Sequence, residues 1–230
     1  MTAFLLALAI FLLAHVVPAA TGLRAFLVAR LGRPLYVALY ATLSVALLAW
    51  VIAAAARAPY VELWPPSPAT AAVPILVMPL AAALLGAAIL EPNPLSVGFR
   101  GSRDAGRIRG VVAVTRHPVL WAFLLWAAAH LVANGDLVSV VLFGGFAAFA
   151  WRGMAVADRR AQAKLGERAW TEAARNTSVV PFAGVIAGRA ASLRSLPSGI
   201  GALLGLAFYA LLLAGLHQAL FGVDPLAWWR

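Results

Sequence analysis

The amino-acid sequence predicts an all-α, polytopic integral membrane protein with about six transmembrane helices and one amphipathic surface helix. Three observations carry this prediction. Of the 230 residues, 63% are hydrophobic and 11% are charged, whereas a soluble domain has about 25% charged residues. The hydrophobic residues gather in long runs. The positively charged residues lie in the connections between those runs, as they do in membrane proteins.

Six apolar runs are candidates for spanning helices, since a bilayer core of about 30 Å needs about 20 residues of helix. They cover residues 3–18, 35–56, 73–90, 117–133, 137–151 and 200–221. No Lys or Arg precedes the apolar part of the first run, which a signal peptide would need. We therefore expect that run to remain as a spanning helix, and residues 1–230 to form a single transmembrane domain.

Prolines and glycines punctuate these runs. Pro79 lies inside the third run, where we expect it to bend the helix, as neighbouring helices tolerate in membranes. The residues at 91–94, Glu-Pro-Asn-Pro, end that run. The residues at 134–136, Asn-Gly-Asp, form a tight turn between the fourth and fifth runs. These two helices should therefore form an antiparallel hairpin.

A polar region follows the fifth run. Its first half, residues 155–175, consists of good helix formers with Ala155, Leu165 and Trp170 on an apolar side and charged residues over the rest. This pattern is typical of a helix that lies on the membrane surface.

The distribution of positive charge predicts the topology. The connections after the first, third and fifth runs hold three, five and eight Lys or Arg residues, which is 16 of the 18 in the chain. These alternate connections should face the cytoplasm, with both termini on the opposite side. The net charge of +10 is explained in the same way, so the expected partner is the lipid bilayer and not a nucleic acid.

The residue inventory limits the chemistry. The chain has no cysteine, which excludes disulfides, thiolate metal sites and covalent c-type haem attachment. The sequence has no P-loop, nucleophile elbow or zinc-protease motif. The apolar runs carry no paired acidic residues, which argues against a proton-coupled transporter. A metal or cofactor must therefore use His, carboxylate, Met or backbone groups.

Four histidines, His15, His117, His130 and His217, are the main candidates for function, because an imidazole inside an apolar segment is costly unless it has a partner. His117 and His130 are thirteen residues apart on one helix, so they lie about 20 Å apart on nearly opposite faces. They cannot share one metal ion. The expected depths in the bilayer allow His15 to pair with His117 or with His130.

A basic rim is expected beside His117 on the cytoplasmic face. Clustered guanidinium groups suit anions such as haem propionates, phosphate or lipid headgroups. The residues that would form it are Arg100, Arg103, Arg107, Arg109, Arg116 and the helix around Arg159. The alternative is that these charges serve only to orient the protein in the membrane.

Three motifs together resemble the NnrU family of bacterial membrane proteins. They are T-R-H-P-x-L with A-H-L-x-x-N-G in residues 115–135, His15 near the end of the first run, and G-x-x-x-W followed by T-S-x-x-P-F in residues 166–182. The resemblance implies a bacterial inner-membrane protein with periplasmic termini, associated with nitrite and nitric oxide reduction. The family is similar to the zeta-carotene isomerases, which bind haem b through histidines. The matching positions here are His15 and His130.

Several functions are therefore expected. The first is a haem-b-binding redox protein, with His15 and His130 as the iron ligands and His117 and Arg116 beside the cofactor, linked to denitrification or to isomerase-type redox chemistry. Its substrate would be a small apolar molecule or a nitrogen oxide. The alternative is a non-enzymatic scaffold or assembly factor for a respiratory or denitrification complex. The third is an S-adenosylmethionine-dependent methyltransferase, because the R-H-P motif also resembles isoprenylcysteine carboxyl methyltransferases. Asp158-Arg159-Arg160 stands where that family has acidic residues, which disfavours methyl transfer.

Overall fold

The computed structural model describes residues 1–100, 108–189 and 192–230 and is helical in its regular structure throughout these ranges. The chain divides into two compact units. The first contains residues 1–64 and 136–142, and the second contains residues 65–135 and 143–230. The prediction of an all-α polytopic membrane protein is confirmed.

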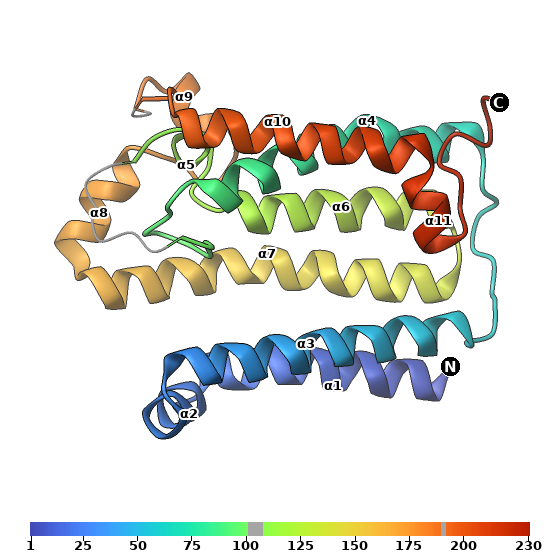
Figure 1. The fold of residues 1–230 in the computed structure, drawn as a ribbon, viewed down its shortest axis with the longest axis horizontal. Helices are drawn as coiled ribbons and strands as arrows, with labels where there is room; N and C mark the ends of the chain where they lie inside the picture. The colour runs from blue at the N-terminus through green and yellow to red at the C-terminus, as the bar shows by residue number, and fades with distance from the viewer. Residues whose placement is uncertain (101–107, 190–191) are drawn as a thin grey trace. The chain divides into compact units, whose positions relative to one another are not determined.

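The first unit is a helical pair with a short third helix. α1 (Thr2–Ala20) packs against α3 (Arg33–Ala56), and the two run in opposite directions (Figure 1). α2 (Leu23–Leu31) lies between them in sequence and is bent by 76° from the axis of residues 2–18. The sequence predicted a connection, and not a helix, where α2 lies. Its nine residues include two arginines, and Gly32 (φ 77°) ends it with a conformation that favours glycine.

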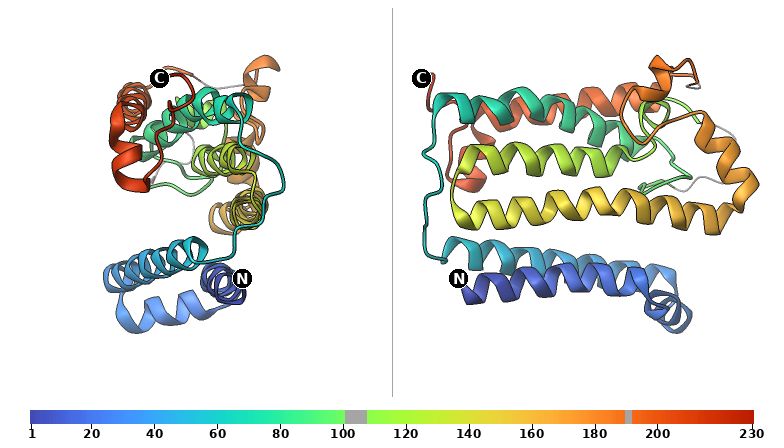
Figure 2. Two further views of the ribbon diagram at one scale, coloured as in Figure 1. Left: turned by 90° about the vertical axis from the view of Figure 1, so that its right-hand side faces the viewer. Right: turned by 180° about the vertical axis from the view of Figure 1, so that it is seen from behind.

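The second unit is built around α4 (Pro68–Leu90), α6 (Pro118–Asn134) and α10 (Leu196–Leu211), which lie side by side (Figures 1 and 2). α4 starts five residues earlier than predicted, because Ser67 and Thr70 form a reciprocal capping box around Pro68. α10 likewise starts earlier than predicted, at Leu196. It passes into a π-helical turn (Leu212–Leu216) and then α11 (His217–Phe221), with Gly215 outside helical geometry at φ 132°.

Glycines allow α4 and α10 to approach closely. A Cβ atom added to Gly86 would lie 2.1 Å from the carbonyl oxygen of Gly201, and one added to Gly205 would lie 2.1 Å from that of Ala82. Close backbone approach through small residues is the usual way in which membrane helices associate. Gly86 is therefore one of the residues at which α4 and α10 meet.

α7 (Leu137–Leu165) starts in the first unit and continues in the second. The turn before it makes the predicted hairpin, since Trp121 contacts Trp151 and Trp126 contacts Phe143. The helix does not stop at residue 151 as expected. Its 29 residues give a length of about 43 Å, so it extends beyond a membrane core of about 30 Å. Gly166 (φ 81°) separates it from α8 (Glu167–Arg175), and the predicted surface helix is therefore α8 together with the last turns of α7.

Within the described residues, four helices are long and apolar enough to cross a membrane, namely α3, α4, α7 and the helix at 196–221. The bent pair α1 and α2 would be a fifth span if the two are counted together. α6 is apolar and has 17 residues, the lower end of the range for a spanning helix. The remaining short helices are α5 (Val111–Val114) and α9 (Ala183–Ile186).

Candidate functional site

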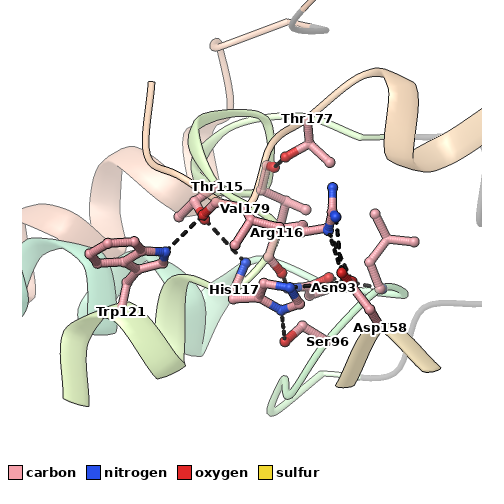
Figure 3. A network of polar contacts seen from close by, with 11 residues as sticks. Asn93, Ser96, Thr115, Arg116, His117, Trp121, Asp158, Thr177 and Val179 are labelled. Carbon is pink, nitrogen blue, oxygen red and sulfur yellow. Dashed lines mark hydrogen bonds and ion pairs between the residues drawn. The ribbon is translucent and has the colours of Figure 1, made fainter. Parts of the chain in front are cut away.

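A cluster of polar side chains lies in the second unit where α4 ends and α6 begins (Figure 3). We call it the polar cluster and define it by Ser96, Thr115, Arg116, His117 and Asp158. These residues come from the segment after α4, the segment before α6, and the part of α7 beyond its apolar stretch at 137–151. Two of the three sequence motifs meet here, since residues 177–182 contact residues 114–116.

The backbone around Thr115 explains how these motifs fit together. The Thr115 hydroxyl donates a hydrogen bond to the Val179 carbonyl (2.8 Å) and accepts one from the His117 amide (3.3 Å). The Arg116 amide donates to the Ser178 carbonyl (2.9 Å). The indole N–H of Trp121 reaches the Val179 carbonyl as well (2.8 Å). The segment before α6 is thus held against residues 177–182 through groups that would otherwise be buried without partners.

Arg116 and Asp158 form a two-point ion pair. The guanidinium Nε lies 2.9 Å from Asp158 Oδ1, and Nη2 lies 2.9 Å from Oδ2. The two side chains are only 14% and 18% exposed, and the guanidinium also faces the Trp170 ring at 5.8 Å. Burial by itself would raise the pKa of the Asp158 carboxyl. The neighbouring His117 imidazole and Arg116 guanidinium outweigh that effect and hold the pKa of Asp158 below its ordinary value.

His117 is completely buried, with an exposed fraction of 0%. Its Nδ1 lies 2.8 Å from the Ser96 hydroxyl, and its Nε2 lies 3.2 Å from Asp158 Oδ1. The second contact has the distance of an ion pair but not the alignment of a hydrogen bond, so Nε2 has no hydrogen-bond partner. Both ring nitrogens therefore face protein groups, and we do not propose His117 as an iron ligand.

A second buried carboxylate stands nearby in the sequence but has different partners. Glu91 is 2% exposed. It accepts hydrogen bonds from Arg109 (3.1 Å), from Ser198 (2.8 Å) and from Ser195. These partners lie just before α5 and at the start of α10, so Glu91 joins three segments at the end of α4.

The expected basic rim is only partly covered by the described residues. Arg103 and Arg107 lie outside them. Arg100 is exposed, whereas Arg109 and Arg116 are paired with carboxylates. Two of the guanidinium groups that were predicted to bind an external anion therefore form ion pairs with carboxylates of the protein itself.

The other histidines lie away from the polar cluster along the chain. His15 is on α1 in the first unit, and His130 is on α6 in the second. In both, Nδ1 lies close to the backbone carbonyl one turn earlier, at 2.7 Å from Phe11 and 2.8 Å from Trp126. His217 Nδ1 also lies near a backbone carbonyl, but this is the carbonyl of Val223, six residues later in the chain, at 2.8 Å.

Aromatic side chains surround His130. The imidazole centroid is 5.6 Å from that of Trp126 and 5.4 Å from that of Phe143. His15 has a similar setting in its own unit, with Phe11 at 4.3 Å and Tyr40 at 5.5 Å. Among the described residues, no three His, Asp or Glu side chains gather as a metal site.

Ser96 and Asn93 were not predicted to be site residues from the sequence, and Glu91 was predicted only to help end a helix. Asn93 donates to the Arg116 carbonyl (3.0 Å) and accepts from the Leu95 amide (2.9 Å), so it fixes the turn that carries Ser96. One feature of the sequence could have identified Glu91 and Asp158 as members of buried ion pairs. The chain has only eight acidic residues, and Glu91 and Asp158 each lie beside a basic connection, where a buried ion pair is the natural use of a carboxylate.

Comparison with known proteins assigns the chain to a family. The sequence model described as "NnrU protein" matches residues 3–225. The chain belongs to the NnrU family. Among curated proteins, it is similar to the chloroplastic 15-cis-zeta-carotene isomerase of Zea mays, with 36% identity over 84 residues, and to that of Arabidopsis thaliana, with 33% identity over 84 residues. No solved structure is significantly similar to it.

The similarity to the isomerases is partial. In both cases it covers 35% of this chain and 22% of the isomerase, so the matched stretch spans about a fifth of the curated relatives. Membership of the NnrU family, in contrast, covers both units. Within the second unit of this NnrU protein, the T-R-H-P and T-S-x-x-P-F motifs serve to build the polar cluster.

Proposed function

We propose that this NnrU protein is a haem-b-binding redox protein of the membrane, with His15 and His130 as the two iron ligands. The observation that carries the proposal is the contact that each imidazole makes within its own helix. In each, Nδ1 faces a backbone carbonyl of its own helix, at 2.7 Å for His15 and 2.8 Å for His130.

That contact favours one tautomer. A carbonyl oxygen can only accept a hydrogen bond, so the proton lies on Nδ1. The lone pair that binds a metal then lies on Nε2, as is usual for histidine ligands whose other nitrogen donates to a backbone carbonyl. Neutral imidazole is a common ligand of haem iron, and the chain has no thiolate to compete with it.

The surroundings of His130 suit a large apolar group. Trp126 and Phe143 lie next to the imidazole, and Phe146 lies 6.0 Å from Trp126. Aromatic faces of this kind favour contact with a flat, apolar macrocycle. Bound haem supplies one-electron exchange at the iron, while the protein supplies the two imidazoles and an apolar setting that excludes water.

The reaction we propose is isomerase-type redox chemistry on a small apolar molecule or a step in nitrite and nitric oxide reduction. The first is favoured by the names of the curated relatives, which are isomerases of 15-cis-zeta-carotene. The second is favoured by the denitrification link that the family resemblance implies. A turnover assay with each substrate class separates the two.

The test is the visible spectrum of the purified full-length protein, oxidised and reduced. We expect a low-spin b-type spectrum that is lost in His15→Ala and in His130→Ala. His217→Ala is the matched control, because its Nδ1 also lies near a backbone carbonyl, and it should keep the spectrum. A folded, colourless protein that does not take up added haem would overturn the proposal and favour a scaffold role.

A further inference from the structure

Ser96, His117 and Asp158 stand in line within the polar cluster. The distance from Ser96 Oγ to His117 Nδ1 is 2.8 Å, and that from His117 Nε2 to Asp158 Oδ1 is 3.2 Å. A hydroxyl, an imidazole and a carboxylate within these distances have the arrangement of an activated nucleophile, its base and the group that orients the base. The three residues come from three different segments, so only the folded chain brings them together.

The charges in the cluster determine where the protons lie. Asp158 accepts from Arg116 through both carboxylate oxygens, so Arg116 already provides its counter-charge. A carboxylate can only accept, so the proton of a neutral His117 is favoured on Nε2, the nitrogen that lies 3.2 Å from Asp158 Oδ1. Nδ1 is then the acceptor, and the hydroxyl of Ser96 donates to it.

Burial distinguishes the base from the nucleophile. His117 is 0% exposed, and among the described residues its Nε2 has no hydrogen-bond partner, so the Nε2 side of the ring is closed to bulk water. Ser96 is only half-buried, and it lies directly before an exposed stretch. A molecule from outside therefore meets the Ser96 hydroxyl first, and a group bound at that oxygen lies next to Nδ1 of His117, which is 2.8 Å from it.

The surface beside Ser96 indicates the substrate class. The two large apolar side chains that follow it are well exposed, at 49% for Val97 and 63% for Phe99. They come a few residues after the end of α4, one of the helices long enough to span the membrane. Exposed apolar side chains at this position suit a ligand with an acyl or other hydrocarbon chain.

We propose that Ser96 is the nucleophile of a second activity, the hydrolysis of carboxylic esters that carry an apolar chain. The hydroxyl oxygen of Ser96 attacks the ester carbonyl while its proton passes to His117 Nδ1. The same proton then passes to the departing alkoxide, which leaves as an alcohol. Water attacks the acyl-serine, gives a proton to Nδ1 and releases the carboxylic acid, and that proton returns to Ser96. Asp158 is a positioning residue that orients the imidazole and stabilises its charged form.

The experiment uses the full-length protein in detergent and a fluorophosphonate probe with an alkyl chain, with the modified residue located by peptide mass spectrometry. Fluoride leaves as the serine oxygen bonds to phosphorus, so the probe reports an activated serine directly. We expect one adduct, on Ser96, in the wild-type protein. His117→Gln should lower the rate of labelling at least about 100-fold, the usual contribution of a general base.

Two substitutions with little effect on folding keep the result interpretable. Ser96→Ala removes one half-buried hydroxyl and should abolish the adduct. Ser192→Ala is the control, because Ser192 is an exposed serine whose hydroxyl, among the described residues, contacts Arg194, and this variant should be labelled like the wild type. Hydrolysis of p-nitrophenyl esters of increasing chain length should follow the same pattern. No adduct on Ser96 in the folded protein, or equal labelling in Ser96→Ala, would overturn the proposal. Neither result depends on haem.

Discussion

Helix α6 has a histidine at each end, and the two histidines have different surroundings. His117, at the start of the helix, is held by side chains from other segments, Ser96 and Asp158. His130, near the end, uses the backbone carbonyl of its own helix and otherwise contacts aromatic rings. Side-chain groups on both nitrogens suit the transfer of protons within the protein. A backbone contact at Nδ1 with an apolar setting suits a metal at Nε2.

The comparison predicts which end of α6 depends more on tertiary contacts. Asp158→Ala leaves the guanidinium of Arg116 without its acceptor and removes the carboxylate beside Nε2 of His117. Removing one partner of a buried ion pair costs about 3 kcal/mol. His130→Ala, measured without haem, removes one hydrogen bond within the helix and should cost about 1 kcal/mol. Thermal unfolding in detergent measures both losses of stability. Equal losses would mean that the contacts of the polar cluster stabilise the protein no more than those around His130.

The close approach of α4 and α10 can be tested by adding a methyl group where the two helices meet. In Gly205→Ala the new methyl group would meet the Ala82 backbone at 2.1 Å, so α4 and α10 must move apart. We expect a loss of about 2 kcal/mol. Gly144→Ala is the control, since its methyl group would meet only the side chain of Leu131 at an ordinary 3.5 Å. A control variant as unstable as Gly205→Ala would show that the helix crossing is not the cause.

Glu91 tests whether every buried carboxylate near the start of α6 affects His117 and Ser96, because its partners differ from those of Asp158. Among the described residues, its partners are two serines and an arginine, and no imidazole is among them. Glu91→Gln keeps the shape and weakens charge-assisted hydrogen bonds, so we expect a loss of about 1 to 2 kcal/mol in unfolding experiments. Labelling of Ser96 and the visible spectrum should stay unchanged. A change in either would assign Glu91 a role beyond joining three segments.

The alternation of positive charge predicts that the two ends of α6 lie on opposite sides of the membrane. Testing this prediction involves no change in stability. Reporter fusions at Asp136 and at Lys164 should report opposite compartments, with Lys164 in the cytoplasm, because the connections rich in Arg and Lys alternate. Both fusions in one compartment would contradict the alternation.

Much of the fold could be predicted from the sequence, because long apolar runs have few structural alternatives in a membrane. The predicted end of the fifth run was wrong because Trp151 ends the apolar stretch but nothing there ends the helix. Gly166 is the residue that does so. α2 was missed because its two arginines made it resemble a connection.

The candidate site was less predictable. The motifs at 115–118 and 177–182 were recognised, but their joining through Thr115 and Val179 depends on tertiary contacts. The partners of His117 and Arg116 lie 21 and 42 residues away in the sequence. Which carboxylate faces which cation depends on how α7 packs against the start of α6, and apolar periodicity does not determine that.

The most direct test of the central claim is the electron paramagnetic resonance spectrum of the oxidised protein, purified with haem supplied during expression. Two imidazoles on one ferric iron give a low-spin signal. We expect this signal in the wild type and in His117→Gln, and a high-spin signal or no haem in His130→Ala and in His15→Ala. A wild-type spectrum without low-spin ferric iron, or a low-spin signal that survives the loss of His130, would contradict ligation of haem by His15 and His130.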